Sequence, residues 1–519
     1  MKILWLDLNS SYAHASLALP ALHAQVMHDP SLEWGVVSAT INENPGMTAG
    51  EVVRQAPDIL AATCWLFNHE VLMHVISRVK AMLPRCVVAL GGPEFLGHNE
   101  DFLRTNRFVG CVFRGEGEET FPQWLACWQQ PKEWTRITGL CFLDTEGQYH
   151  DNGLSRVMAF DKLVNPEQSP FFNWSKPFVQ LETTRGCFNT CAFCVSGGEK
   201  PVRTLSVEAI RERVRLIHEK GIRNIRVLDR TFNYQSHRAK ALFDLFREFP
   251  DMRFHLEIHP ALLSEELKQE LASMPKGLRY LCALDNMETH ADLIAGLPLY
   301  HLSQIFDDVR TLAEYRAGEI QLESLKLLPG TEMRRRAEEL GICYSPLPPY
   351  EVLQTREITP DELQTARQLS RLLDGFYNAP AWQEITRRLI VEEPDFLTRF
   401  LDHLIQIGVI DQPMGLERRG ILLYHFCKEH YPLFLTAMSR AWIEAGMSLK
   451  KEPAERVRTK HVTPPEAWTV CTGTYRDDLR LCKLPAPEEG RCYWYGFETE
   501  SQQLRPVFAA VSEELTPAP

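Results

Sequence analysis

The first 113 residues alternate short apolar runs with helical segments, and this alternation restricts the possible fold more than any other feature of the chain. The apolar runs, each about the length of a buried strand, span residues 3–8, 35–41, 59–64, 86–90 and 109–113. Between the third and the fourth run, residues 69–83 place apolar side chains at helical spacing on one face. Strands joined by crossover helices form a parallel sheet covered on both faces. We therefore predict a doubly wound α/β domain over residues 1–136.

Glycine-rich, acidic segments follow two of these strands. They consist of Gly91, Gly92, Pro93 and Glu94 after the fourth run, and of Gly115, Glu116, Gly117 and Glu118 after the fifth. Ligands of doubly wound sheets bind beyond the carboxyl ends of the strands, where glycine allows the backbone to approach closely. Paired glycines at strand ends also occur as simple tight turns, so both interpretations stay open on the residues alone. No Gly-x-Gly-x-x-Gly follows the first strand, which disfavours a nicotinamide or flavin dinucleotide.

Three cysteines lie close together near the middle of the chain. Cys187, Cys191 and Cys194 have three and then two residues between them, in a turn rich in Gly, Asn and Ser that follows the apolar run 178–181. A [4Fe-4S] cube takes one thiolate on each iron, so a compact loop can supply three and leave the fourth iron open. Structural zinc is the alternative, but zinc needs four ligands, commonly as two separated pairs, and no second cysteine pair lies nearby. The spacing therefore favours a cluster with one open iron.

The pattern Cys-x-x-x-Cys-x-x-Cys after a strand resembles the radical SAM superfamily. The resemblance implies that the three cysteines hold a [4Fe-4S] cluster, that its open iron binds S-adenosylmethionine, and that Phe193, Gly296 and Pro298 lie against the adenine. It also implies reductive cleavage of S-adenosylmethionine to methionine and a 5′-deoxyadenosyl radical, with an electron donor such as flavodoxin or ferredoxin as partner. The expected fold is a parallel βα barrel over residues 175–345, reached through a connector at residues 137–174 that includes a small hairpin.

The predicted barrel is short of residues. Between the helix that begins at Ser264 and the strand around Asp292, only residues 277–288 are available, whereas a βαβ unit takes roughly 30 residues or more. A strand and most of a helix are therefore expected to be missing between about Gly277 and Leu278, and residues 278–284 are either the end of the lost helix or a strand in their own right. Polar residues that follow the barrel strands either face its pocket or cap the strand ends; they are Asp229, Asn233, Glu257 and His259.

The N-terminal segments resemble the cobalamin-binding domain that precedes many radical SAM enzymes. In that domain the strand-end loops surround the corrin ring, which implies corrin contacts for both glycine-rich segments and for Asn9 and Ser10 after the first strand. Histidine-ligated relatives carry Asp-x-His-x-x-Gly in this loop, and Asn9 occupies the histidine position of the sequence that begins at Asp7. The cobalt would then lack a lower imidazole ligand unless His14 supplies one. The alternative for His14 is an ordinary loop histidine.

The composition changes after the proline run that ends at Pro349. Thr359 begins a helix with a capping box, and further stretches at helical spacing predict a mainly helical domain over residues 346–519. This part resembles the C-terminal extension of a largely uncharacterised family of cobalamin-type radical SAM proteins. Cys471, Cys482 and Cys492 lie among strand-like segments and are either ordinary buried thiols or ligands of an auxiliary cluster.

Charge and hydropathy limit the partners. The 519 residues carry a net charge of −12, which makes nucleic acid an unlikely partner and does not favour an anionic membrane. No apolar run reaches the length of about 18 residues that a membrane span needs, and the first residues do not resemble a signal peptide, so we expect a cytoplasmic protein without a membrane partner.

Most characterised relatives of this architecture are methyltransferases. The resemblance therefore implies a cobalamin-dependent enzyme that methylates an unactivated carbon of a small-molecule or peptide substrate, whose identity the sequence does not reveal. Two alternatives stay open: a radical rearrangement or cyclisation enzyme, and a non-catalytic Fe-S and cobalamin binding protein with an incomplete barrel.

Overall fold

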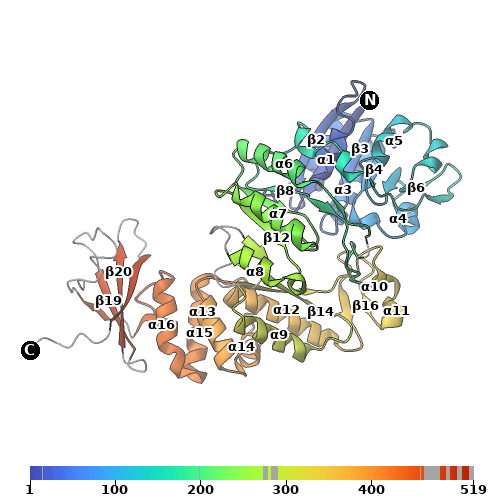
Figure 1. Cartoon of the computed structure of the whole chain (residues 1–519). Coiled ribbons are helices and arrows are strands. Elements are labelled where there is room, and N and C mark those ends of the chain that lie inside the picture. The colour runs from blue at the N-terminus through green and yellow to red at the C-terminus, as the bar shows by residue number, and fades with distance from the viewer. Residues whose placement is uncertain are drawn as a thin grey trace, which may run out of the picture. The chain divides into compact units, whose positions relative to one another are not determined.

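The computed structural model divides the chain into two compact units, each described by its own elements (Figure 1). The first unit contains residues 1–289, 296–299 and 324–359, and the second contains residues 290–295, 300–323 and 360–519. The residues described are 1–14, 16–197, 199–272, 279–281, 290–455, 458–460, 480–486, 491–498 and 505–512. All residues predicted from the sequence to bind a cofactor lie in the first unit.

A seven-stranded sheet opens the first unit and confirms the predicted doubly wound domain. Its order is β2-β1-β3-β4-β5-β6-β7, with the pairs among the first five strands parallel and those of β6 and β7 antiparallel. The strands are β1 (Lys2–Asn9), β2 (Glu33–Thr40), β3 (Ile59–Thr63), β4 (Val87–Gly91), β5 (Cys111–Phe113), β6 (Leu140–Leu143) and β7 (Tyr149–Asp151). The last two are the hairpin expected in the connector, and they extend this sheet.

Alternation of side chains along the strands gives this sheet an apolar core on each face. Ile3 and Trp5 pack in one core with residues of α1 (Ala18–Ala24) and α5 (Thr120–Ala126). Leu4 packs in the other core with residues of α2 (Pro45–Gln55), α3 (His69–Met82) and α4 (Glu100–Thr105). Because neighbouring residues of a strand point to opposite faces, one apolar strand supplies both cores.

The central part of the first unit is a four-stranded parallel sheet of order β13-β12-β11-β8. Its strands are β8 (Val179–Leu181), β11 (Asn224–Val227), β12 (Arg253–Glu257) and β13 (Arg279–Leu281). Alternate strand residues form a core with α6 (Val207–Glu219), α7 (Ser236–Arg247) and α8 (Glu265–Ala272). The sequence places α6 clearly, because the Ser206 hydroxyl accepts a hydrogen bond from the Ala209 amide and Gly221 takes a positive φ just after the helix.

The strands of the predicted barrel are divided between two sheets. Residues 279–281 form β13 beside β12, which is the second of the two alternatives for residues 278–284. The next strands, β14 (His290–Ala295) and β15 (Glu319–Ser324), pair with each other in a separate sheet. Within the described ranges, β13 and the β14–β15 pair thus belong to different sheets. Gly277 and Leu278 themselves lie outside the described residues.

The second unit confirms the mainly helical C-terminal region. Its helices are α9 (Leu302–Glu314), α12 (Pro360–Leu372), α13 (Gln383–Glu392), α14 (Phe396–Gln406), α15 (Leu416–His430) and α16 (Leu435–Glu444). An antiparallel sheet follows, with β18 (Arg458–Lys460), β19 (Arg480–Ala486), β20 (Arg491–Glu498) and β21 (Arg505–Ser512) in chain order. Cys482 and Cys492 fall on the neighbouring strands β19 and β20, whereas Cys471 lies outside the described residues.

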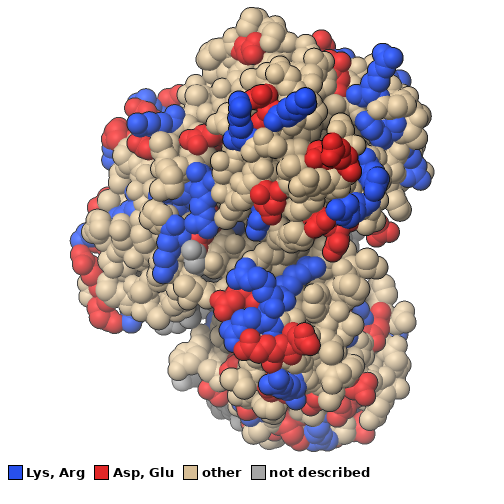
Figure 2. All heavy atoms as spheres, turned by 90° about the vertical axis from the view of Figure 1, so that its right-hand side faces the viewer, with Lys and Arg blue, Asp and Glu red and all other residues tan. Residues whose placement is uncertain are grey.

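Charges of both signs are mixed on the face drawn in Figure 2. Acidic and basic residues lie next to each other there, and the described residues of that face form no continuous basic surface (Figure 2). Of the helices in the described part of the chain, none has the length and apolar content needed to cross a membrane.

Candidate functional site

The cysteine loop is closed at its base by a short antiparallel ladder. β9 (Thr184–Arg185) pairs with β10 (Arg203–Thr204), so that Arg185 stands directly opposite Arg203. Inside the loop, the Cys187 amide donates to the Glu199 carbonyl at 3.0 Å. The Cys194 amide donates to the Cys191 carbonyl at 3.1 Å, forming a tight turn between these two cysteines. The ladder and these bonds fix the path of the loop that carries all three cysteines.

The three thiols of the loop differ in exposure. Cys187 is buried, Cys194 is half-buried and Cys191 is exposed. The pKa of Cys191 is raised by partial burial and then by the charges of Cys194 and Cys187. Among the described residues, no three His, Cys, Asp or Glu side chains converge closely enough to hold one metal ion. A [4Fe-4S] cluster takes each thiolate on a different iron, so three thiols on one loop could serve three of its four irons.

Two glycines are required by the shape of the loop. A Cβ at Gly197 would lie 2.4 Å from the Cys191 carbonyl oxygen and 3.0 Å from that of Cys194. Gly186 has a φ of +96°, and a Cβ there would lie 2.6 Å from the Glu199 carbonyl oxygen. Contacts this short with backbone oxygens cannot be relieved by a side-chain rotation, so the loop depends on glycine at both positions.

Asp229 anchors the strand that leads into the cysteine loop. Its buried carboxylate accepts hydrogen bonds from the amides of Thr183 and Thr184, each at 2.8 Å, and from the Thr183 hydroxyl. Arg238 donates to the Thr183 carbonyl at 3.1 Å on the other side of the same residue. Burial raises the pKa of Asp229, although these hydrogen bonds oppose the shift. Of the two interpretations of Asp229, a residue that faces the pocket or one that caps a strand end, these contacts support the second.

The side chain of Asn233 also forms hydrogen bonds with the backbone. Its side-chain amide donates to the His259 carbonyl at 3.0 Å, and its side-chain oxygen accepts from the His259 amide at 2.8 Å. These two bonds tie the segment after β11 to the end of β12. The carbonyl of Glu257 accepts from the Phe232 amide at 2.8 Å, while the Glu257 side chain is exposed.

A cavity of about 570 Å³ lies within the first unit, between the N-terminal loops and the cysteine loop. The N-terminal domain contributes the loop after β1, the helix α1 and the loop after β3. The central part contributes the ends of β8 and β11 and both flanks of the cysteine loop. Lining residues include Asn9, Ser10, His14, Ala21, Trp65, Phe67, Glu116, Glu118, Gln180, Glu182, Arg185, Gly186, Ser196, Glu199 and Arg230. We call this space the inter-loop cavity.

A second cavity of about 250 Å³ lies at the carboxyl ends of β3, β4 and β5. Its wall is made largely of small and apolar residues, among them Ala61, Ala62 and Ala89. Trp5 also lines it, and the buried indole N–H of Trp5 has no hydrogen-bond partner within the described chain. A largely apolar group that carries a hydrogen-bond acceptor therefore fits the lining of this strand-end cavity.

Most residues expected at the corrin line one of the two cavities. Gly91, Gly92, Pro93, Gly115 and Gly117 line the strand-end cavity, Asn9 and Ser10 line the inter-loop cavity, and Glu116 and Glu118 line both. His14 lines the inter-loop cavity with its Nδ1 at 2.9 Å from the Ser11 hydroxyl, so both interpretations of His14 stay open. Phe193 is half-buried on the cysteine loop, Gly296 is buried and Pro298 is half-buried, and these three are not among the described residues lining either cavity.

Glu94 has a different position from its neighbours. Its buried carboxylate accepts a hydrogen bond from the Tyr350 hydroxyl at 2.8 Å and lies 3.2 Å from Nδ1 of His69. Tyr350 has a φ of +58°, a left-handed conformation that is uncommon for a bulky residue. Glu94 therefore fastens the segment 324–359 to the N-terminal loop rather than lining either cavity.

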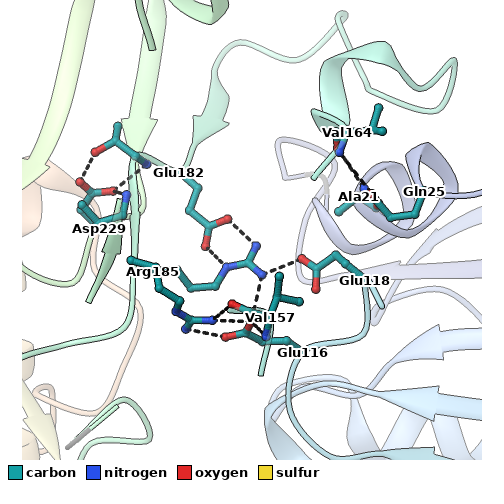
Figure 3. A network of polar contacts seen from close by, with 12 residues as sticks. Ala21, Gln25, Glu116, Glu118, Val157, Val164, Glu182, Arg185 and Asp229 are labelled. Atoms are coloured by element: carbon teal, nitrogen blue, oxygen red, sulfur yellow. Dashed lines mark hydrogen bonds and ion pairs between the residues drawn. The ribbon is translucent and has the colours of Figure 1, made fainter. Parts of the chain in front are cut away.

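A network of carboxylates and guanidinium groups, drawn in Figure 3, contributes Glu116, Glu118 and Arg185 to the walls of both cavities. The Arg185 guanidinium lies between Glu182, at 2.7 Å, and Glu118, at 2.9 Å, and also reaches Glu116 at 3.4 Å (Figure 3). Arg203 binds both oxygens of Glu116, at 2.7 and 2.8 Å. Arg203 also pairs with Glu199 at 3.1 Å. We call these six residues the inter-loop network.

The electrostatics of this network follow from burial and close charges. Burial alone would raise the pKa of Glu116, but the hydrogen bond from Arg203 and the charge of Arg185 hold it below its ordinary value. Burial, and then the charge of Glu116, raise the pKa of Glu199. Glu116 therefore stays ionised and is the centre of the network.

Several of these residues were not identified from the sequence. Arg185 and Arg203 have no motif of their own, and only the fold brings them to Glu116. Trp65 and Phe67, which line the inter-loop cavity, are 39% and 44% exposed and stack on each other with ring centroids 6.3 Å apart. Their position just after β3, at a ligand-binding strand end, is a signal that the sequence did contain.

Family models match two regions of the chain. Residues 181–289 match the model described as the radical SAM superfamily, which includes the cysteine loop. Residues 338–438 match the model described as a protein of unknown function, DUF4080.

Curated proteins resemble the chain over part of its length. A 2-(S-pantetheinyl)-carbapenam-3-carboxylate methyltransferase of Streptantibioticus cattleyicolor is 21% identical over 60% of this chain and 53% of that protein. The hopanoid C-3 methylase of Methylococcus capsulatus is 28% identical over 32% of this chain and 33% of that protein. The chain thus spans about half the length of the first of these relatives and a third of the second.

Two solved structures share the fold. The radical S-adenosylmethionine methyltransferase TsrM from Kitasatospora setae, with tryptophan substrate and a SAM analogue bound, has a TM-score of 0.54 at 14% identity, covering 70% of this chain and 81% of that one. The cobalamin-dependent S-adenosylmethionine radical enzyme OxsB, with aqua-cobalamin and S-adenosylmethionine bound, has a TM-score of 0.56 at 13% identity. This match covers 85% of this chain and 79% of that one.

Proposed function

We propose that this chain, which carries a radical SAM domain, is a cobalamin-dependent radical SAM enzyme that methylates an unactivated carbon. Cys187, Cys191 and Cys194 would hold a [4Fe-4S] cluster, and the strand-end cavity, together with the part of the inter-loop cavity that the N-terminal loops line, would hold the cobalamin. When bound, the cluster supplies the electron that cleaves S-adenosylmethionine, and the cobalamin supplies the methyl group.

The observation that carries this proposal is the inter-loop cavity. One side of it is formed by the strand-end loops of a doubly wound domain, and the other by the flanks of a loop with three thiols. The three cysteines are not among the described residues that line this cavity, but both flanks of their loop are, so a cluster on the loop would lie next to it. A substrate bound in the cavity would then be held in a fixed distance and orientation to both cofactors. The relatives named as methyltransferases support methylation as the outcome.

The chain's own residues then divide into three tasks. Asp229 and the two glycines of the loop fix the position of the thiols. The strand-end cavity, with its small residues and the unpaired indole N–H of Trp5, binds and orients the corrinoid. Trp65 and Phe67 line the inter-loop cavity and would offer apolar contact surface to a ligand bound there.

The cluster is tested by anaerobic reconstitution with iron and sulfide. The wild-type chain is expected to develop a thiolate-to-iron absorption band, and replacement of Cys187, Cys191 and Cys194 by Ala should abolish it. Cys343→Ala is the matched control, because that exposed thiol lies outside the loop. An unchanged band in the triple variant would disprove the cluster assignment.

The cobalamin site is tested by retention of the corrinoid on a desalting column. Ala21 lines both cavities, so Ala21→Trp should fill the site and abolish retention. Ala81→Trp, on the exposed side of α3, should leave retention unchanged. Retention by Ala21→Trp equal to wild type would place the corrinoid elsewhere.

The reaction is tested by its products under reducing conditions. The reconstituted chain should form 5′-deoxyadenosine from S-adenosylmethionine and add one methyl mass to its substrate. A product that forms with 5′-deoxyadenosine but without the added mass of a methyl group would favour the rearrangement or cyclisation alternative. A chain that holds both cofactors and forms no 5′-deoxyadenosine would instead be a binding protein, which is the outcome expected if the divided barrel cannot hold S-adenosylmethionine.

A further inference from the structure

The base of the cysteine loop contains two like charges that face each other. Arg185 and Arg203 are a directly opposed pair of the β9–β10 ladder. Side chains of directly opposed residues lie on the same face of a ladder within about 5.5 Å at Cβ, and like charges there are destabilising. The ladder therefore needs a counter-charge between the two guanidinium groups.

The counter-charge comes from the N-terminal domain. Glu116 receives two hydrogen bonds from Arg203, at 2.7 and 2.8 Å, and lies 3.4 Å from Arg185. The Glu116 carboxylate also accepts a hydrogen bond from the Val157 amide at 2.7 Å, which helps to keep it in place (Figure 3). The side chains of Glu116, Arg185 and Arg203 are only 13%, 15% and 7% exposed, so water screens the network weakly.

Glu116 also belongs to the walls of both cavities. It lies in the loop after β5, between Gly115 and Gly117, which line the strand-end cavity. A ligand in these cavities would displace water from the network and strengthen its ion pairs. The same ion pairs hold the base of the cysteine loop. A ligand that orders the network from the cavities therefore also favours the ordered state of the cysteine loop, and the reverse holds for a ligand on that loop.

We propose that Glu116 is a positioning residue that couples the two cofactor sites, so that cobalamin and the iron-sulfur cluster each raise the affinity of the chain for the other. This inference rests on the proposed function. Coupling between two sites is reciprocal, and it typically changes affinity by about 5- to 150-fold. Arg185 and Arg203 carry the coupling from Glu116 to the cysteine loop.

The test measures the dissociation constant of hydroxocobalamin by equilibrium dialysis, with the full chain either cluster-loaded or cluster-free. The wild-type chain should bind at least about 5-fold more tightly when the cluster is present. Glu116→Gln keeps the size and polarity of the side chain but removes its charge, so the ratio of the two constants should fall to about one. Asp151→Asn is the matched control: it removes a comparable ion pair, to Arg114 at 2.9 Å, outside both cavities, and should keep the wild-type ratio.

A second measurement keeps the test valid if Glu116→Gln folds poorly. Arg203→Lys preserves the charge but loses the two-point contact, and should give a ratio between those of wild type and Glu116→Gln. As the reciprocal readout, the rate at which a chelator removes iron from the oxidised cluster should fall on adding hydroxocobalamin in wild type and Asp151→Asn, and stay unchanged in Glu116→Gln. A wild-type ratio of one, or an unchanged ratio in Glu116→Gln, would overturn the coupling. Failure of the wild-type chain to bind either cofactor would instead overturn the proposed function.

Discussion

Replacing Asp229 by Ala tests whether the cysteine loop depends on a buried anchor behind it. The substitution removes the acceptor of two backbone amides and one hydroxyl, all buried. A buried donor left without a partner costs about 1–3 kcal/mol. Partial relaxation reduces the sum, so we expect the segment around Thr183 and Thr184 to lose about 2–5 kcal/mol of local stability.

Hydrogen–deuterium exchange of the cluster-free chain measures this loss directly, because the Thr183 and Thr184 amides are themselves the donors. A loss of at least about 2 kcal/mol corresponds to at least about 30-fold faster exchange when reclosing is faster than exchange, because the rate then follows the opening equilibrium. Asp229→Asn retains one carbonyl oxygen, so its exchange rate should lie between those of wild type and Asp229→Ala. The reconstituted Asp229→Ala chain should also hold less iron than wild type.

The matched control is Asp244→Ala on the neighbouring helix α7. The Asp244 side chain is 62% exposed, and its carboxylate forms an ion pair with Arg247, one turn away on the same helix, at 2.7 Å. We expect an effect below about 0.5 kcal/mol. If Asp229→Ala and Asp244→Ala gave the same exchange rates in residues 181–187, Asp229 would not be the anchor of this loop.

Three further predictions concern the loop and its surroundings. Gly197→Ala should lower the iron bound per chain after reconstitution, because its Cβ would lie 2.4 Å from a backbone oxygen, whereas Gly50→Ala on α2, with its nearest neighbour at 3.8 Å, should bind iron like wild type. Tyr350→Phe should lower the free energy of unfolding in urea by about 1–2 kcal/mol, because buried Glu94 loses a hydrogen bond. The surface control Tyr12→Phe should change that free energy by less than about 0.5 kcal/mol. Equal effects of the two variants would contradict the fastening role of Tyr350. The pKa of Glu116 lies below its ordinary value of 4.5, so its ionisation stabilises the folded chain above that pH, and this contribution is lost as the pH falls through the lowered pKa. Below pH 4.5, the free energy of unfolding of the cluster-free chain should therefore depend less on pH in Glu116→Gln than in wild type.

The sequence by itself determined the elements and the thiol motif. Apolar runs of strand length and a helix with a Ser206 cap are local patterns, and the structure has these elements within a few residues of the expected positions. The spacing of Cys187, Cys191 and Cys194 is also local, because one short loop carries all three. Patterns of this kind are readable since the side-chain period and the turn chemistry depend only on neighbouring residues.

Only the tertiary structure decided which charges meet and which strands pair. Glu116 and Arg203 are 87 positions apart, and nothing in either segment indicates that they bind each other. Glu94 looked like part of a ligand loop, yet its contact is Tyr350, 256 positions away. The position of Asp229 at a strand end suited a pocket residue as well as an anchor, and its burial against Thr183 settled the choice. Long-range contacts such as these depend on how whole elements pack, which no local pattern specifies.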